Sequence, residues 1–380
     1  NLGSSLYGSY APNNFKVNFS DNGIINIPYV SMGANYPDVS WQKTTMKNIG
    51  LDFYLLSDRI SGSFDFFRND ITRLLGYAST SPLAIYETRP INGGHYYRRG
   101  WELMVDTKNL VGEFTWDTSL TFSKTNSFWK ERLPNYDYQI YQQRENEPMS
   151  AYYYYNVTGI INTDRSNMPE SQKTLQAEAQ LPGCPIIEDK NKDGKIDEND
   201  VYMKDNSPAI YVGIGNTFTY KRFEFSFFMY GQFGIQKYNI AYSAAQAGPL
   251  AVDYPENSNK FAYRLWNSQT NPNGSRPGLA IGKMGALPGN AWVNADRENA
   301  SFMRMRNITL AYNLAGNILG SLQRYVRNIK VYVDAQNPFI LTKFQGFDPE
   351  IYTGGGGASG GSRGEYPQTR TFSLGANITF

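Results

Sequence analysis

Residues 43 to 380 contain long stretches in which apolar and polar side chains alternate one by one, and this alternation limits the fold more than any other feature of the chain. In NIGLDFYLL (48–56), one face carries Ile49, Leu51, Phe53 and Leu55. The same period returns in FTWDTSLTFS (114–123), FEFSFFMYGQF (223–233) and FSLGANITF (372–380). An amphipathic helix would repeat its apolar positions about every 3.6 residues, so these stretches predict β-strands.

The pattern predicts nine strands, at residues 43–56, 60–75, 98–108, 113–125, 209–221, 223–236, 301–314, 328–337 and 369–380. Most of them have about ten residues or more, which is enough to cross a bilayer at a tilt. The region before residue 43 adds one or two weaker candidates around Phe15 to Phe19 and Ile24 to Tyr29.

The connections between these strands alternate in length. Short turns fall at 57–59, 109–112 and 221–222, and Ala315 to Arg327 is a short-side connection that the spacing of its apolar residues predicts to be helical. Long loops fall at 76–97, 126–208, 237–300 and 338–368, the last with a Gly-rich run at 354–361. Outer-membrane barrels have tight periplasmic turns and long external loops, so the sequence favours an all-β, antiparallel transmembrane β-barrel over a soluble sandwich or jelly roll.

The strand count and the chain start indicate part of a larger barrel. Nine strands are an odd number, whereas bacterial barrels of this type have an even one, so we expect earlier strands upstream. The chain begins at Asn1 without Met or an apolar leader, and we expect it to be a C-terminal fragment.

Composition excludes several classes of function. A net charge of +2 gives no indication of a nucleic-acid partner. The single Cys184 excludes a disulfide framework, and the single His95 excludes a multi-His metal site. No HExxH or GxSxG motif occurs, and no paired acid and base is specified by spacing, so we expect no enzymatic activity.

Residues 189 to 200, DKNKDGKIDEND, follow the spacing of a calcium-binding loop. The predicted metal ligands are Asp189, Asn191, Asp193, the carbonyl of Lys195, Asp197 and Asp200, with Gly194 at the sharp turn. Five Asp and two Glu between Glu188 and Asp205 would repel one another without a cation. Pro and strand-like runs flank the loop, so we predict a structural Ca²⁺ rather than a switch; the alternative is a solvated acidic turn.

Several segments together resemble the SusC-like TonB-dependent transporters of Bacteroidetes. They are NYPDVSWQKTTMKNIGLDFYLLSDRISGSFDFFRNDITRLL (35–75), RRGWELMVDTKN (98–109), the acidic loop, FMRMRNITLAYNL (302–314), VYVDAQNPFILTKFQGFDPE (331–350) and YPQTRTFSLGANITF (366–380). The resemblance implies an outer-membrane barrel of twenty-two strands around an N-terminal plug. Residues 1–380 would be its C-terminal half, with external loops 126–208, 237–300 and 338–368, and without the plug.

The resemblance also implies a function. Such proteins import oligosaccharides, or in some members peptides, with a SusD-like surface lipoprotein as a lid and energy from TonB. We therefore expect active oligosaccharide import across the outer membrane, in contact with outer-membrane lipid. The alternatives are a peptide importer or a non-transporting surface barrel that serves as an adhesin or scaffold.

Aromatic side chains in the external loops are the candidate substrate contacts, because their rings stack on apolar faces of sugars. The candidates are Tyr152, Tyr153, Tyr154, Trp129, Trp266, Trp292 and, beside them in a predicted loop, His95. The competing interpretation is that such residues form the interfacial girdle or pack one loop against another.

Overall fold

The computed structural model describes residues 39–79, 88–134, 138–142, 146–207, 209–239, 263–278, 281, 284–295, 297–315, 319–346, 348–350 and 368–380, with short strand segments at 10–12, 18–19, 25–26 and 29–31. The predicted Gly-rich run at 354–361 lies outside these residues. The chain divides into two compact units. Unit 1 holds 1–47, 68–99 and 127–149, and unit 2 holds 48–67, 100–126 and 150–380.

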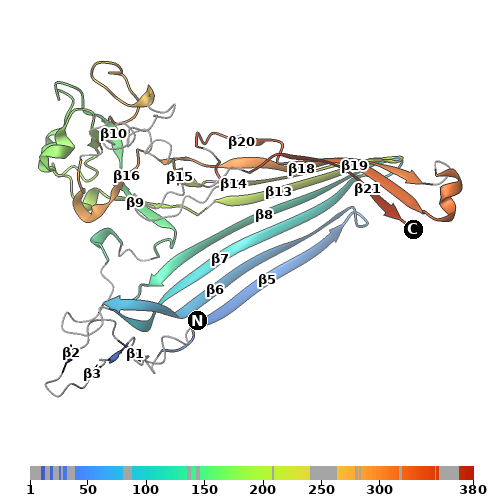
Figure 1. Cartoon of the computed structure of the whole chain (residues 1–380), viewed down its shortest axis with the longest axis horizontal. Coiled ribbons are helices and arrows are strands. Elements are labelled where there is room, and N and C mark those ends of the chain that lie inside the picture. The colour runs from blue at the N-terminus through green and yellow to red at the C-terminus, as the bar shows by residue number, and fades with distance from the viewer. Residues whose placement is uncertain are drawn as a thin grey trace. The chain divides into compact units, whose positions relative to one another are not determined.

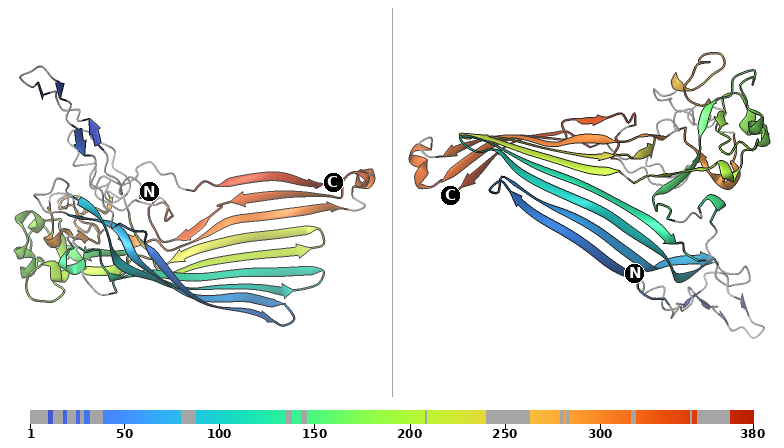
Figure 2. Two further views of the ribbon diagram at one scale, coloured as in Figure 1. Left: turned by 90° about the horizontal axis from the view of Figure 1, so that it is seen from below. Right: turned by 180° about the vertical axis from the view of Figure 1, so that it is seen from behind.

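One large antiparallel sheet contains all nine predicted strands, in chain order. They are β5 (Lys43–Leu55), β6 (Ile60–Ser79), β7 (Thr88–Leu110), β8 (Phe114–Glu131), β13 (Ile210–Tyr220), β14 (Phe223–Phe233), β18 (Phe302–Ala315), β19 (Asn328–Gln336) and β21 (Thr371–Thr379). Each pairs with the next, and the short β20 (Ile340–Thr342) also pairs with β18 (Figures 1 and 2). The prediction of an all-β, antiparallel fold is confirmed.

Two adjacent rows of side chains show the chemistry of the sheet's faces. The first row follows paired residues across six strands and is apolar: Trp116, Phe218, Phe225, Leu310, Val333 and Leu374. The next row is polar: Asp117, Thr217, Ser226, Thr309, Asp334 and Ser373. Phe225, Leu310 and Leu374 are 38%, 49% and 82% exposed, as expected of side chains that face lipid. The polar row then marks the face toward the barrel interior.

The predicted loop at 76–97 is wrong in its bounds, because β6 continues to Ser79 and β7 already begins at Thr88. Pro90, Gly93 and Gly94 interrupt the alternation of apolar and polar residues in this stretch. The sequence pattern therefore did not indicate a strand before residue 98. Gly94 has a φ of 73°, in the region that favours glycine. His95 therefore lies within a strand and not in a loop.

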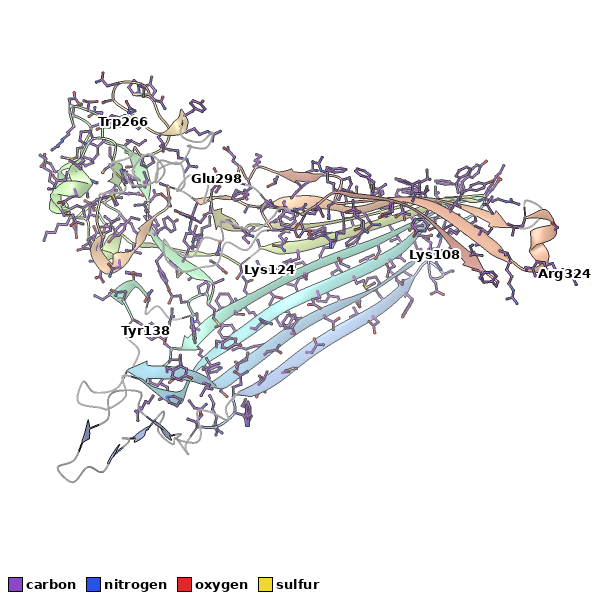
Figure 3. All side chains as sticks on the ribbon, viewed as in Figure 1. Lys108, Lys124, Tyr138, Trp266, Glu298 and Arg324 are labelled. Atoms are coloured by element: carbon purple, nitrogen blue, oxygen red, sulfur yellow. The ribbon has the colours of Figure 1, made fainter. Side chains whose placement is uncertain are left out.

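The connections follow the predicted short and long alternation. Three residues with left-handed φ, Leu56, Ser57 and Asp58, form the turn between β5 and β6, and Lys221 with a φ of 54° turns β13 into β14. The predicted helical connection between β18 and β19 contains a short 3₁₀ helix, η10 (Gly320–Arg324), where Figure 3 labels Arg324. Across the described residues, no helix has the length and apolar character needed to cross a membrane.

The long connections of unit 2 form small sheets with a core of their own. The sheets are β12 (Tyr202–Asp205) with β9 (Ala151–Tyr155) and β16 (Trp292–Val293), β10 (Val157–Ile160) with β11 (Pro185–Ile187), and β15 (Gln236–Tyr238) with β17 (Arg297–Asn299). Short 3₁₀ helices accompany them, among them η2 (Glu170–Thr174), η3 (Ala177–Gln180), η4 (Glu198–Asp200) and η8 (Pro288–Asn290). Tyr155, Ile161, Cys184 and Val201 are fully buried, so this connection region is a packed body.

The remaining described elements lie in unit 1. The 3₁₀ helix η1 (Ile140–Gln142) follows β8. Before β5, β1 (Tyr10–Pro12) pairs with β4 (Tyr29–Ser31), and β2 (Asn18–Phe19) pairs with β3 (Ile25–Asn26). β2 and β3 fall within the two weaker strands expected from the sequence.

Candidate functional site

The predicted calcium loop closes on its own backbone. The Asp189 carboxylate accepts hydrogen bonds from the backbone N–H groups of Asp193 at 3.2 Å and Gly194 at 2.9 Å. Gly194 has a φ of 83°, which an L side chain would adopt only with strain, so the glycine at this position is required by the turn. The loop thus wraps around its first acidic residue.

Asp200 ties the two ends of the loop together from a fully buried position. Its Oδ1 accepts from Lys190 N at 2.8 Å, and its Oδ2 accepts from Asp197 N at 2.9 Å. Asp197 in turn caps η4 by accepting from Asn199 N at 2.8 Å. The predicted first and last ligand positions are therefore held in one compact turn.

The donor set of this loop fits a hard cation in type, since carboxylate, amide and carbonyl oxygens are the ligands that Ca²⁺ prefers. A carboxylate oxygen that accepts one N–H keeps a second lone pair for a cation. Nowhere in the described residues do three His, Cys, Asp or Glu side chains already converge as a metal site. The calcium site stays a prediction.

The loop is joined to the connection sheets by buried polar contacts. The Tyr155 hydroxyl, fully buried on β9, lies 2.9 Å from the Asp197 carbonyl oxygen and 3.0 Å from the Pro288 carbonyl oxygen. Ile196 N donates to Thr174 Oγ1 at 3.1 Å. The conformation of the acidic loop is thereby coupled to β9 and η8.

A row of aromatic rings lies beside the acidic loop and includes two of the predicted substrate contacts. The rings of Tyr152 and Tyr154 stack at 5.2 Å, and Tyr154 stacks on Tyr202 at 5.7 Å. Arg297 lies 3.7 Å over the Tyr152 ring, and the Lys190 ammonium lies 4.7 Å over the Tyr202 ring. The ring faces are in contact with one another and with the two cations, and these contacts favour a role in packing over a role in substrate binding.

Burial controls the ionisation at one end of this row. It raises the pKa of Tyr152, against the opposing effect of Arg297, and it lowers the pKa of Arg297 itself. The Tyr152 hydroxyl also pairs with Gln236 on β15. Tyr152 therefore connects two of the small sheets as a neutral phenol.

The other predicted contacts are distributed over the chain. Tyr153 pairs with Met203 in the β9–β12 ladder, and the backbone of Trp292 pairs with Tyr154, while the Trp292 side chain lies outside the described part. Trp266, which Figure 3 labels, belongs to unit 2. It packs against Gly183, whose φ of 87° and proximity to the indole leave no room for a side chain. The structure unites Tyr152, Tyr153, Tyr154 and the Trp292 backbone in one small sheet, and Trp266 lies elsewhere in unit 2.

His95 and Trp129 belong to unit 1. His95 Nε2 lies 3.2 Å from Asp70 Oδ1, and the Trp129 ring meets Tyr96 edge-on at 6.1 Å, with Arg132 5.1 Å over it. None of these contacts tests substrate binding, which stays a prediction for all seven residues.

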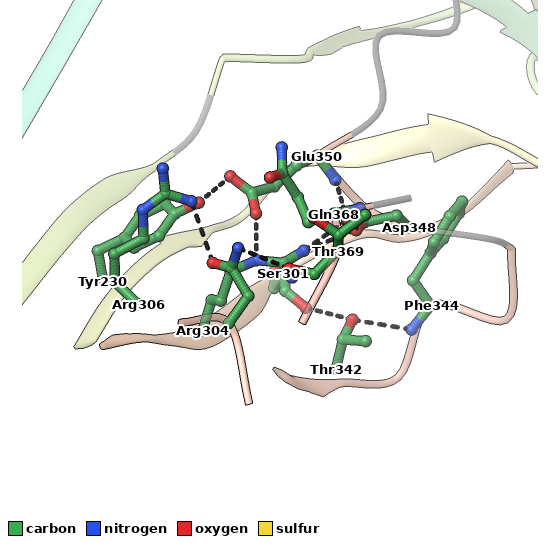
Figure 4. Close-up of polar contacts among 11 residues, drawn as sticks. Tyr230, Ser301, Arg304, Arg306, Thr342, Phe344, Asp348, Glu350, Gln368 and Thr369 are labelled. Carbon is green, nitrogen blue, oxygen red and sulfur yellow. Dashed lines mark hydrogen bonds and ion pairs between the residues drawn. The ribbon is translucent and has the colours of Figure 1, made fainter. Parts of the chain in front are cut away.

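Sequence reasoning missed a buried ionic cluster on the inner face of the sheet. Arg304 of β18 pairs with Asp348 and Glu350, and Glu350 accepts from the hydroxyl of Tyr230 on β14 (Figure 4). Arg304 and Asp348 are 3% and 8% exposed. A charged residue within an alternating strand was the available signal, but its partner lies 44 positions away in the chain.

A groove with a mixed polar and apolar lining lies near the short-turn end of the same inner face. Its volume is about 410 Å³, and its lining includes Asp117, Thr217 and Ser226 together with Phe227 and Phe228. The wall therefore offers hydrogen-bonding groups to the barrel interior at this level.

The sequence of the chain is similar to those of known TonB-dependent receptors. No protein-family model matches the chain. Over 352 residues it is 28% identical to the TonB-dependent receptor SusC of Bacteroides thetaiotaomicron, covering 90% of this chain and 32% of that protein. Over 363 residues it is 25% identical to the TonB-dependent receptor P3 of Formosa agariphila, covering 90% of this chain and 34% of that protein. The chain thus spans about a third of the length of the curated relatives it matches.

The fold is also found in solved structures. A structure described as the RagAB peptide importer in the closed-closed state superimposes with a TM-score of 0.72 at 18% identity, covering 99% of this chain and 39% of the other. A structure of the RagAB peptide transporter gives a TM-score of 0.71 at 19% identity. At this identity the likeness shows the fold alone.

Proposed function

The chain is a homologue of the SusC-like TonB-dependent receptors of the outer membrane, and on that premise we propose that it forms a wall and external loop region of a nutrient importer. The observation that carries this proposal is the pair of adjacent rows across six strands, one apolar and one polar. A wall of this kind separates lipid from an aqueous interior through which cargo passes.

Oligosaccharide is the proposed cargo, with a SusD-like surface lipoprotein as partner and TonB as the source of energy. The relationship to SusC-like receptors supports this choice. The polar inner face adds hydroxyl, amide and carboxylate groups, which suit a ligand rich in hydroxyls. The fold shared with a peptide importer keeps a peptide cargo as the second candidate.

Calcium is proposed as a structural ion of the 189–200 loop. The support is the oxygen-rich spacing, the tight turn at Gly194 and the closure of the loop around Asp189 and Asp200. In this role the cation would relieve repulsion among the loop's carboxylates and stiffen the surface on which the lipoprotein or the cargo rests.

The test is to extract the intact receptor from outer membranes in mild detergent and to determine the mass of every species that copurifies. The expected result is a stoichiometric lipoprotein with a trapped oligosaccharide. A trapped peptide would instead establish the second candidate. A barrel that never carries a lipoprotein, together with unimpaired growth of a deletion strain on every glycan and peptide tested, would contradict import and favour an adhesin or scaffold.

A further inference from the structure

A pair of arginines lies on aromatic rings where β6, β7 and β8 pass beside one another. The rings of Tyr97 and Phe128 stack at 5.4 Å. The guanidinium of Arg68 lies 4.3 Å over the Tyr97 ring, and that of Arg99 lies 5.2 Å over the Phe128 ring. Asp70 and His95 complete the group through their contacts with Arg68 and with each other. We call these six residues the arginine–aromatic cluster.

The cluster lies on the lipid-facing side of the sheet. Phe128 is an even number of positions from Trp116 along β8, so it shares the face of the apolar row. Tyr97 stacks on Phe128, and Arg99 shares the Tyr97 face of β7. Arg68 contacts Tyr97 from β6. All four side chains are therefore on the outside of the wall.

The chemistry of that outer face changes at the cluster. Along β6 it presents Phe64 and Phe66 before Arg68, and along the antiparallel β7 it presents Trp101 and Leu103 after Arg99. The short turns that begin and end these strands lie on the apolar side of this change. The cluster is thus at the border of the hydrocarbon layer toward the long, external connections, where outer-membrane barrels carry their aromatic girdle.

The charges of the cluster do not cancel. Asp70 accepts from Arg68 Nε at 3.1 Å and from Arg68 Nη2 at 3.1 Å, which fixes the guanidinium plane and balances its charge. Arg99 is exposed, and no ion pair involves it within the described chain. The Arg68 side chain is still 42% exposed beside it. An anion that approached from the membrane border would meet the exposed guanidinium of Arg99 beside the partly exposed guanidinium of Arg68.

We propose that the arginine–aromatic cluster binds the phosphate of an outer-leaflet lipid headgroup. Arginine is suited to phosphate because its planar fork of N–H donors matches the phosphate oxygens. Stacking on Phe128 holds the guanidinium of Arg99 in place and leaves its N–H edge open to the ligand, while Arg68, whose Nε and Nη2 bond to Asp70, offers its remaining N–H groups beside it.

The sequence itself supplies a matched control, because Arg98 and Arg99 are neighbours on β7 with side chains on opposite faces. Arg98 Nε contacts Ser127 Oγ at 3.5 Å on the inner face. Arg98→Gln and Arg99→Gln therefore remove the same charge at the same level of the wall. A general effect of charge on the membrane would act equally in both variants.

The experiment is native mass spectrometry of the intact receptor in detergent, titrated with lipid A, the phosphorylated glycolipid of the outer leaflet. We expect bound lipid to fall about tenfold in Arg99→Gln and in Arg68→Gln, the loss expected when one charge-assisted hydrogen bond is removed. We expect no change in Arg98→Gln. Equal retention in all four proteins, or an equal loss in Arg98→Gln and Arg99→Gln, would overturn the proposal.

A second arm needs no variant and so does not depend on the folding of one. The unaltered receptor is offered lipid A and its dephosphorylated form, which share their acyl chains, at equal concentration. Preference for the phosphorylated lipid by about tenfold supports recognition of the phosphate. Equal binding of the two lipids would show that the acyl chains alone are held and would overturn the proposal.

Discussion

Arg304 on β18 donates from Nη2 to both carboxylate oxygens of Asp348, at 2.7 and 2.8 Å. Asp348 also accepts from the backbone N–H of Glu350 at 2.9 Å and from that of Gln368 at 3.2 Å. Both backbone groups belong to the last long connection of the chain. Arg304, buried on the inner wall, therefore anchors Asp348 and, through Asp348, two points of that connection (Figure 4).

Replacing Arg304 tests this anchor. Arg304→Met would leave two carboxylates with no cation in a buried place, and we expect a loss of about 3–5 kcal/mol in the free energy of unfolding. The measurement is urea unfolding of the receptor in lipid bilayers. Arg306→Met is the control, because Arg306 is exposed and its side chain donates to Asn337 Oδ1, at 3.0 Å. We expect this change to cost about 1 kcal/mol or less. Equal losses in the two variants would contradict the anchor.

Removing two acidic residues tests the calcium loop. We expect calorimetry on the intact receptor to show one site that takes up Ca²⁺, and Asp189→Ala with Asp193→Ala to abolish that heat, since both supply predicted ligand oxygens. Asp164→Ala is the control, because Asp164 is exposed in the same connection region and accepts from Ser166 N. Absence of uptake in the unaltered protein would refute the site.

The hydroxyl of Tyr155 tests whether the acidic loop depends on the connection core. Tyr155→Phe removes a buried donor shared between the Asp197 and Pro288 carbonyls, and we expect a local loss of about 1–3 kcal/mol. Hydrogen exchange of the amides at 196–201 should accelerate accordingly. Tyr263→Phe, at a side chain that is 86% exposed, should leave those rates unchanged. Unchanged rates in Tyr155→Phe would show that the two parts are independent.

The buried thiol of Cys184 predicts a loss of stability in alkali. Burial raises the pKa of Cys184 to about 11 from the ordinary value of 9.0. The folded connection region therefore favours the protonated thiol, so this stability is fully present below pH 9 and is lost as the pH rises toward 11. We expect iodoacetamide to modify Cys184 at pH 8 only after unfolding, and Cys184→Ala to lose part of the alkaline decline. Rapid modification of the folded protein would contradict the burial.

The sequence predicted the wall of this molecule better than its site. Each strand of the wall carries its own two-residue alternation, as in Phe223 to Phe233, so local pattern was enough to find all nine. The local pattern failed at the start of β7, because Pro90 and two glycines interrupt the alternation there. The strand begins at Thr88 because it pairs with its neighbours, and not because of its local sequence preference.

The site depends on contacts that no local pattern encodes. Arg304 and Asp348 meet only because the chain returns to the inner wall after β20. Four consecutive tyrosines suggested a binding surface, but side chains alternate on β9, so Tyr152 and Tyr154 stack on one face and Tyr155 enters the core. The acidic loop was the exception, because its spacing is itself the signal and the turn at Gly194 lies where it was expected.

The two-faced wall is tested most directly by one charge placed on either of two neighbouring residues of β18. Leu310→Lys puts an ammonium into lipid, whereas Thr309→Lys puts it beside Asp334, whose carboxylate Thr309 contacts at 2.6 Å. For the receptor in bilayers we predict a loss of about 2–4 kcal/mol in the free energy of unfolding for Leu310→Lys, and less than about 1 kcal/mol for Thr309→Lys. Equal losses, or a larger loss at Thr309, would contradict the assignment of the apolar row to lipid and the polar row to the interior.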